Sequence, residues 1–293
     1  MPGILILKLG ATGDVVRTTP LLKHLAGEVS WITAAKNTPL LTGLVLPLRS
    51  GSWEQRARFC DREYDLVINL EDTQEVAQFL PQLKFKKLFG AYAKPDGSLD
   101  YTDDSGGWFD LSLISRFGKA AADRLKLENR RTYLDLIFSG LGLQFKGENY
   151  LLPEPAKGGL GGDVAIAPKA GHVWPMKNWA YYPELKIALE ARGLTVNVLP
   201  ERASLLEHLG DVKNHRVLVS GDSLPMHFAL GLGVRCVTLF NCTSPWEIYP
   251  YGLQRQIASP LLAEFFFQRG LDERAVKAIT LDKVFLAVLE QLC

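Results

Sequence analysis

The chain has 293 residues, of which 47% are hydrophobic and 22% are charged, and its formal net charge is +1. This length favours two domains, and a charge near zero in both halves argues against the basic surface that nucleic-acid binding needs. The four cysteines include no C-x-x-C pair, and the first apolar run is too short for a signal peptide or a membrane span. We therefore expect a soluble cytoplasmic protein with reduced thiols.

The N-terminal half alternates short apolar runs with helical patterns. Strands are predicted at residues 4–9, 29–33 and 65–70, and helices at residues 53–62, 73–80 and 130–143. Residues 90–110 are rich in turn residues, and their acids and aromatics fit either an acceptor groove or a plain surface loop. The alternation itself favours a parallel sheet covered by helices.

The C-terminal half repeats this pattern after a linker rich in proline and glycine, predicted at residues 153–162. Strands are predicted at residues 163–168, 194–200, 215–222 and 234–240, and helices at residues 179–192, 202–210 and 225–232. We therefore expect an α/β protein with two doubly wound domains, residues 1–152 and 163–293, whose last helix is free to pack back on the N-terminal domain. Ligands of such domains bind at the carboxyl ends of the strands.

The first candidate site follows the first predicted strand. Gly10 and Gly13 let the backbone approach a ligand, although the full G-x-G-x-x-G pattern of dinucleotide binding is missing. Asp14 is interpreted either as a helix N-cap or as a base that faces a neutral hydroxyl, because a carboxylate beside a phosphate would be repelled. Thr19 precedes Pro20, so the helix either kinks there or restarts with Thr19 as its cap.

The second candidate is "SGDSLPMHFALGLG", residues 220–233, where a helix begins after a predicted strand. Asp222 and Ser223 supply side-chain acceptors, and the segment is interpreted either as a plain helix cap or as an anion site at a helix N-terminus. Ser223 is able to donate to a phosphate oxygen. His227 either faces a sugar or fills the core.

The third candidate is "APKAGHVWPMKNW", residues 167–179. Lys177 suits a phosphate as a point charge, or its alkyl chain covers a neighbouring tryptophan. Asn69 and Glu71 follow another strand and are candidates for binding acceptor hydroxyls. We predict no metal site, because the histidines have no metal-ligand spacing and no D-x-D motif occurs.

Three segments in chain order resemble glycosyltransferase family 9, whose best-known members are the ADP-heptose:lipopolysaccharide heptosyltransferases. These segments are "ILILKLGATGDVVRTTPLLKHL", "WPMKNWAYYPELKIAL" and "SGDSLPMHFALGLGVRCVTLFNCTSPWEIYPYG". The resemblance implies a GT-B fold, in which two Rossmann-like domains face each other across a cleft. It also implies an inverting, metal-independent transfer from a nucleotide-sugar, with no cofactor.

The resemblance also implies roles for individual residues. Asp14 is the expected base, Lys177 neutralises the leaving diphosphate, and Asp222 holds hydroxyls of the donor sugar. Ser223 and the N–H groups after it bind phosphate, and Glu201 binds the donor ribose. The donor-binding set is completed by Leu224, Met226, His227 and His172.

The sequence departs from the family pattern at two places. The usual D-T-G-P-M-H reads D-S-L-P-M-H, so Leu224 replaces a glycine expected close to phosphate. Gly171, His172 and Val173 replace the usual threonines and serines, with His172 as a substitute donor. These departures affect the identity of the nucleotide and the sugar more than the class of reaction.

The main hypothesis is therefore transfer of heptose from ADP-heptose to a hydroxyl of a lipopolysaccharide core or another surface glycan. The expected partners are a nucleotide-sugar and a glycan or lipid-linked glycan acceptor, with at most peripheral contact to the inner face of the cytoplasmic membrane. Two alternatives are a nucleotide-sugar epimerase of the GT-B fold and a non-catalytic nucleotide-sugar-binding relative.

Overall fold

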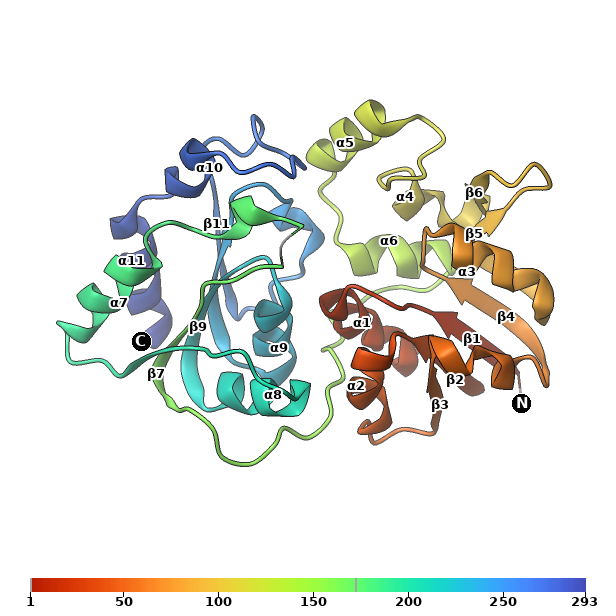
Figure 1. Ribbon diagram of the computed structural model, residues 1–293, viewed down its shortest axis with the longest axis horizontal. Coiled ribbons are helices and arrows are strands. Elements are labelled where there is room, and N and C mark those ends of the chain that lie inside the picture. The colour runs from red at the N-terminus through yellow and green to blue at the C-terminus, as the bar shows by residue number, and fades with distance from the viewer. Residues whose placement is uncertain (1, 172) are drawn as a thin grey trace. The chain divides into compact units, whose positions relative to one another are not determined.

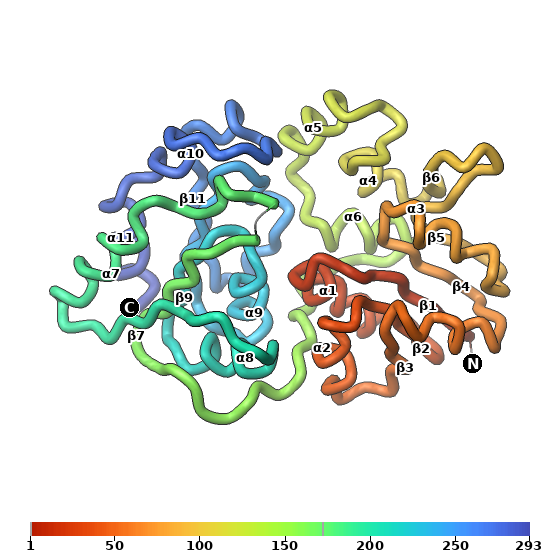
Figure 2. The backbone as a smooth tube through the Cα atoms, viewed as in Figure 1, coloured from red at the N-terminus to blue at the C-terminus, as the bar shows by residue number. Residues whose placement is uncertain are grey.

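The computed structural model describes residues 2–171 and 173–293 (Figure 1). The chain divides into two compact units, Met1–Pro153 and Glu154–Cys293. Figure 2 follows the same backbone from the N-terminal unit, drawn in red to yellow-green, to the C-terminal unit, drawn in green to blue. No helix formed by the described residues is long and apolar enough to cross a membrane.

The N-terminal unit is built on a six-stranded sheet with the strand order β3-β2-β1-β4-β5-β6. Its strands are β1 (Gly3–Leu7), β2 (Glu28–Thr33), β3 (Leu48–Ser52), β4 (Glu63–Asn69), β5 (Lys84–Ala93) and β6 (Leu99–Tyr101). Only the β5–β6 pair is antiparallel among these strands. The run "ILIL" of β1 is buried because β1 lies between β2 and β4.

Short helices connect these strands. The α-helices are α1 (Thr12–Thr18), α2 (Thr38–Thr42), α3 (Gln74–Phe79), α4 (Gly106–Phe109), α5 (Lys119–Glu128) and α6 (Tyr133–Gly140). The 3-10 helices are η1 (Thr19–Lys23), η2 (Ala35–Asn37), η3 (Trp53–Phe59), η4 (Leu80–Gln82) and η5 (Asp103–Ser105). The helix predicted at 53–62 is thus a 3-10 helix, and the turn-rich residues 90–110 contain the end of β5, all of β6, η5 and α4.

The C-terminal unit is built on a five-stranded sheet with the order β11-β10-β9-β7-β8, and all of its strand pairs are parallel. Its strands are β7 (Gly162–Ala167), β8 (Val196–Val198), β9 (His215–Gly221), β10 (Arg235–Phe240) and β11 (Gln254–Ala258). Its helices are η6 (Pro175–Lys177), α7 (Tyr182–Glu190), α8 (Leu205–Lys213), α9 (Leu224–Leu232), η7 (Pro245–Glu247), α10 (Glu273–Lys277) and α11 (Leu281–Leu292). These two mostly parallel sheets confirm the expected α/β class.

The last helix, α11, belongs to the core of the C-terminal unit. Its buried residues Val284, Ala287 and Val288 pack in one hydrophobic cluster with α7 and with strands β7, β9 and β10. The apolar stripe of α11 is therefore covered by its own sheet, and its packing on the N-terminal domain stays a prediction.

The predicted linker lies along α8. The N–H of Ala156 donates to the carbonyl of Leu206 at 3.0 Å, and the N–H of Leu160 donates to Asp211 Oδ1 at 2.9 Å. The side-chain amide of Asn214 reaches the carbonyl of Gly158 at 2.9 Å. These bonds tie residues 156–160 to the C-terminal unit.

Candidate functional site

Asp14 lies in the first turn of α1, just beyond the carboxyl end of β1. The N-cap of α1 is Ala11, whose backbone is extended, and the peptide bond before it is cis. Asp14 is three residues further on, and its Oδ2 accepts the N–H of Ala11 at 3.2 Å. The N-cap interpretation of Asp14 is therefore wrong: its carboxylate reaches back to the cap from inside the helix, as acids at this position do.

Two cations stand beside this carboxylate. Arg17 Nη2 lies 2.9 Å from Asp14 Oδ1, and Lys8 Nζ lies 3.9 Å from Asp14 Oδ2. The Asp14 side chain is 31% exposed, whereas those of Lys8 and Arg17 are 11% and 10% exposed. Two cations therefore lie beside Asp14 in the free protein, its carboxylate is still partly exposed, and its role as a base that faces a neutral hydroxyl stays a prediction.

Glu71 completes this charged cluster from the end of β4. Its Oε1 lies 2.9 Å from Lys8 Nζ and also accepts the backbone N–H groups of Leu9 and Gly10, at 2.8 and 3.3 Å. Burial lowers the pKa of Lys8, but the charges of Glu71 and Asp14 outweigh it and leave the pKa raised. Lys8 is therefore held in its charged form, and Glu71 holds the loop before α1, while its contact with an acceptor hydroxyl stays a prediction.

The side chains of Asn69 and Thr19 also make hydrogen bonds within the N-terminal unit. Asn69 is fully buried, donates to the carbonyl of Ala91 at 2.7 Å and accepts the N–H of Glu71 at 3.1 Å. Thr19 is 1% exposed, and its hydroxyl donates to the carbonyl of Val16 at 2.7 Å while it accepts the N–H of Leu151 at 2.8 Å. Internal hydrogen bonds therefore engage both side chains in the free protein, and a role for Asn69 and Thr19 beside the acceptor stays a prediction.

Gly10, Gly13 and the Thr19-Pro20 pair lie in or beside α1, and each has a defined place in the structure. A Cβ on Gly10 would meet no heavy atom within 4 Å, so this residue borders open space, whereas Gly13 is buried inside α1. At Thr19 the chain changes from α1 to η1, with Pro20 in the first turn of η1. The helix therefore restarts as one alternative predicted, but its cap is Thr18 and not Thr19.

In the C-terminal unit, Lys177 and Asp222 form an ion pair. Lys177 Nζ donates to Asp222 Oδ2 at 2.8 Å and to the main-chain carbonyl of Asp222 at 2.7 Å. The two side chains are 14% and 16% exposed. Burial would raise the pKa of Asp222, but the charge and hydrogen bond of Lys177 outweigh it and hold that pKa well below its usual range.

This pair joins two neighbouring strands of the sheet at their carboxyl ends. Lys177 closes η6, which follows β7, and Asp222 follows β9, which pairs with β7. Gly221 permits the approach, since a Cβ at this residue would lie 2.7 Å from the carbonyl oxygen of Lys177. Lys177 Nζ also lies 5.7 Å from the Trp174 ring centroid, so the alternative of a lysine over a tryptophan is compatible with the ion pair.

The N-cap of α9 is Ser223 and not Asp222. The Ser223 side chain makes no capping bond, and its Oγ donates weakly to the carbonyl of Gly221 at 3.4 Å. Asp222 contributes its carboxylate to Lys177 instead. Ser223 is therefore the cap by its backbone position alone, and its hydroxyl is only loosely held.

The residues after Ser223 differ in their access to a ligand. Leu224 is the first residue of α9 and is half-buried, and its helical backbone accommodates a side chain where the family pattern has glycine. The N–H of Met226 donates to the carbonyl of Ser223 at 3.1 Å, and Met226 is fully buried. His227 is 5% exposed, and its charge contributes to the lowered pKa of Asp222. Met226 therefore fills the core.

The two remaining candidates for donor binding are Glu201 and His172. Glu201 is 87% exposed and pairs with Lys169, also exposed, at 3.1 Å. His172 lies outside the described residues. Among residues 2–171 and 173–293, no group of three or more His, Cys, Asp or Glu side chains is arranged to hold a metal ion.

Sequence reasoning assigned no role to Lys8 or Arg17. Both are buried cations, with 9% and 8% of the whole residue exposed. Such residues are almost never fully buried unless they are paired. The available signal was therefore a charge inside the predicted strand 4–9 and a charge on the buried side of a helix.

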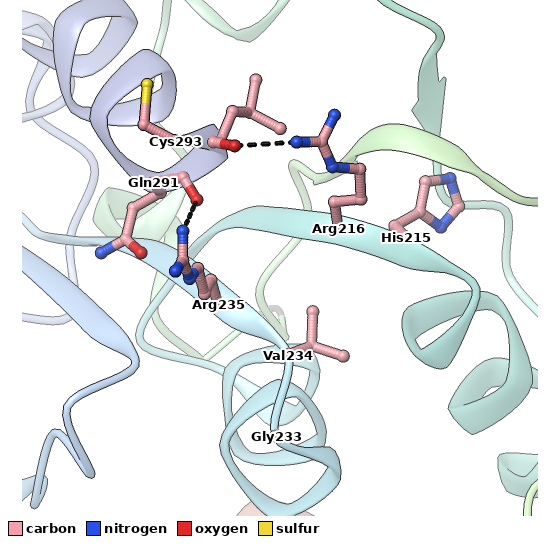
Figure 3. Close-up of a pocket in the computed structure, with 8 residues that line it drawn as sticks. His215, Arg216, Gly233, Val234, Arg235, Gln291 and Cys293 are labelled. Carbon is pink, nitrogen blue, oxygen red and sulfur yellow. Dashed lines mark hydrogen bonds between the residues drawn. The ribbon is translucent and has the colours of Figure 1, made fainter.

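A pocket of about 430 Å³ lies at the opposite end of the C-terminal sheet, where β9 and β10 begin. Figure 3 shows Arg216 and Arg235 bonded to carbonyls at the end of α11, those of Leu292 and Gln291, at 2.7 and 2.8 Å. His215, which also lines the pocket, is bonded at both ring nitrogens. Arg216 and Arg235 therefore anchor the last helix, as basic residues at helix C-termini do.

Comparisons with known proteins agree with the resemblance seen in the sequence. The model of glycosyltransferase family 9 (heptosyltransferase) matches residues 184–264, which contain the second candidate segment. The resemblance is thereby confirmed for this segment, and the match supports glycosyltransferase activity. A search of the curated proteins finds no match.

Solved structures similar to this chain include three bacterial transferases. The Escherichia coli ADP-heptose lipopolysaccharide heptosyltransferase II is 15% identical with a TM-score of 0.67, covering 100% of this chain and 98% of its own. The E. coli heptosyltransferase WaaC, solved with ADP-2-deoxy-2-fluoro heptose, is 15% identical with a TM-score of 0.61. The match covers 98% of this chain and 99% of the WaaC chain. The iron-containing dodecameric glycosyltransferase TibC of enterotoxigenic E. coli is 12% identical with a TM-score of 0.57, covering 99% and 76%. These similarities confirm the expected GT-B fold class.

Proposed function

We propose that this chain transfers heptose from ADP-heptose to a hydroxyl group of a lipopolysaccharide core or another surface glycan, by an inverting and metal-independent displacement. The observation that carries the proposal is Asp14, a partly exposed carboxylate at the carboxyl end of the central strand β1. The family model over residues 184–264 supports the reaction class. The ADP and ADP-sugar bound to similar structures support the donor.

Asp14 is the general base in this proposal. It accepts the proton of the acceptor hydroxyl while the acceptor oxygen forms a bond to the anomeric carbon of the sugar. The bond between that carbon and the diphosphate oxygen breaks on the opposite side, so the configuration inverts and ADP leaves. Arg17 and Lys8 favour the charged form of the carboxylate, which is the form that a base needs.

Lys177 and Asp222 bind the donor in this proposal. Lys177 donates to the leaving diphosphate, and Asp222 accepts hydroxyls of the sugar. In the free protein these groups bond to each other, so donor binding exchanges their ion pair for contacts with the ligand. Ser223 and the first N–H groups of α9 contact phosphate, because helix N-termini favour anions. Exposed Glu201 is available for the ribose.

The acceptor sets where the reaction occurs. A lipid-linked glycan lies at a membrane surface, so we place the protein at the inner face of the cytoplasmic membrane, in peripheral contact. In this proposal each unit contributes separately, the base from the N-terminal unit and the donor contacts from the C-terminal unit. Donor binding and turnover are therefore measurable as separate properties.

The test compares Asp14→Asn with Asp135→Asn, a matched control. Asp135 occupies the same helix position in α6, where its Oδ2 accepts the N–H of the cap residue Thr132 at 3.0 Å. We expect Asp14→Asn to lower kcat by about 10²–10⁴-fold, the usual contribution of a general base, with ADP affinity unchanged. Asp135→Asn keeps the wild-type kcat, since it loses only a capping interaction.

The assay follows free ADP and the sugar product by nuclear magnetic resonance, with and without acceptor. Transfer releases ADP only when an acceptor is present. A change of sugar configuration without an acceptor would instead identify an epimerase. If Asp14→Asn turns over at the wild-type rate, the base assignment is refuted, and if no nucleotide binds, the proposed reaction is refuted.

A further inference from the structure

Arg17 is held against two aromatic rings that lie far from it in the sequence. Its guanidinium carbon lies 4.1 Å from the ring centroid of Tyr133 in α6 and 5.4 Å from that of Trp108 in α4. The two rings meet edge to face, with centroids 4.8 Å apart and an interplanar angle of 86°. Placed over the Tyr133 ring and beside Trp108, the guanidinium has little freedom to turn. We call Arg17, Trp108 and Tyr133 the arginine clamp.

The clamp holds the side chain of Asp14. Arg17 is one helical turn after Asp14, and its Nη2 reaches Asp14 Oδ1 at 2.9 Å. The second oxygen, Oδ2, accepts the N–H of Ala11 at 3.2 Å. Both carboxylate oxygens are thus held from different directions, and rotation of the carboxylate would break one of these contacts.

The clamp also holds the main chain of Asp14. The hydroxyl of Thr18 donates to the carbonyl of Asp14 at 2.6 Å and lies 2.8 Å from Tyr133 Oη. Because the Thr18 hydroxyl donates its one hydrogen bond to the Asp14 carbonyl, Tyr133 Oη is the donor in its bond with Thr18. Tyr133 is 2% exposed, and burial raises the pKa of its hydroxyl. The hydroxyl therefore stays protonated and is able to donate this hydrogen bond. One tyrosine therefore supports Asp14 through Arg17 and through Thr18.

We propose that Arg17 is a positioning residue, which the clamp uses to direct the Asp14 carboxylate toward the acceptor hydroxyl; this inference rests on the proposed function. A base abstracts a proton efficiently only when its oxygen is within hydrogen-bond reach and correctly aligned. Arg17 acts through Asp14 and takes no proton itself. Neither the rings nor the guanidinium needs to touch the substrate for this role.

The test compares Arg17→Met and Arg17→Lys with Arg49→Met. Arg49 is a matched control in the same unit, since its guanidinium carbon lies 4.9 Å from the Phe59 ring centroid and its Nη2 lies 3.2 Å from Asp61 Oδ2. It therefore has an aromatic ring and a carboxylate, but Asp14 is not its partner. We expect Arg49→Met to leave kcat and KM unchanged.

For Arg17→Met we expect kcat to fall by about 10–10²-fold, the effect of a misplaced catalytic group, with the donor KM within about twofold of the wild type. Arg17→Lys keeps the charge and the fold but loses the planar guanidinium over the rings. Its kcat is therefore expected to lie between that of Arg17→Met and that of the wild type. In Arg17→Ala, added guanidinium ion is expected to restore part of kcat, whereas methylammonium, which cannot stack, does not. A purely structural role predicts no such difference between the two cations.

Three results would overturn the inference while the proposed function stands. These are a wild-type kcat in Arg17→Met, a full kcat in Arg17→Lys, and equal rescue of Arg17→Ala by both cations. Absence of sugar transfer by the wild-type chain is a different result, because it overturns the proposed function and the role of Arg17 with it. Thermal unfolding of each variant verifies that the chain is folded at the assay temperature.

Discussion

Removal of Lys177 is expected to destabilise the C-terminal unit far more than removal of an ordinary surface lysine. Lys177→Met leaves the Asp222 carboxylate, 16% exposed, without the ammonium group that lies 2.8 Å away in the wild type. Loss of one partner of a buried ion pair costs about 3–5 kcal/mol, because the remaining charge is poorly solvated. For a unit of about 140 residues, each kcal/mol lowers Tm by about 4 °C, so we expect a decrease of about 12–20 °C.

The two partners are not equivalent in this pair. After Asp222→Asn, Lys177 keeps its bond of 2.7 Å to the main-chain carbonyl of residue 222, so we expect a smaller loss, about 1–2 kcal/mol. In the double variant, Lys177→Met with Asp222→Asn, neither position of the pair carries a charge. The double variant is therefore expected to unfold at a higher temperature than Lys177→Met alone.

The measurement is thermal and urea unfolding of the full chain, followed by circular dichroism. Lys186→Met is the matched control, since Lys186 pairs with Glu190 one turn along α7, and both side chains are at least one-third exposed. Such a pair contributes about 0.3–0.5 kcal/mol. The reasoning is refuted if Lys177→Met costs no more than Lys186→Met, or if the double variant is no more stable than Lys177→Met.

Two other changes test the packing and the electrostatics of the C-terminal unit. Gly221→Ala is expected to cost about 1–3 kcal/mol in urea unfolding, because its Cβ would lie 2.7 Å from the backbone oxygen of Lys177; a cost below about 0.5 kcal/mol would contradict this. Asp211 is fully buried, and although burial opposes it, the hydrogen bonds of Arg202, at 2.7 and 2.9 Å, lower the pKa of this carboxyl. Its stabilising effect is therefore fully present above the unfolded pKa of about 3.9 and is lost as pH falls through the lower folded value. In urea unfolding between pH 2 and 7, we expect Asp211→Asn to have a lower free energy of unfolding than the wild type at pH 7. Its free energy of unfolding should also fall less steeply as the pH is lowered. A fall as steep as that of the wild type would argue against the stabilising role of the ionised Asp211.

The position of the candidate residues along the chain followed from local sequence pattern. A continuous apolar run predicted β1, and the glycines after it predicted the loop that leads to Asp14. The same logic placed Asp222 and Ser223 at the start of α9. Strand β3 was not predicted, because "LRSGS" lacks a long apolar run, and it forms by pairing with β2.

The bonds of these residues did not follow from pattern. Asp14 lies in the first turn of α1 and Asp222 lies just before α9, so an N-cap was a reasonable interpretation for each. The cap of α1 is Ala11, because the extended backbone of the loop decides where the helix starts. Asp222 bonds Lys177, 45 residues earlier, because parallel strands β7 and β9 bring their carboxyl ends together.

The sequence alone determined the α/β class, the order of most elements and the short segments in which the candidate residues lie, because hydrophobic periodicity and glycine or proline signals act over a few residues. Only the tertiary structure decided which polar groups are bonded internally and which remain open. Asn69 and Thr19 are bonded internally, whereas Asp14 stays partly exposed between Arg17 and Lys8. Burial and long-range ion pairs arise when distant segments pack, and local pattern carries no record of those partners.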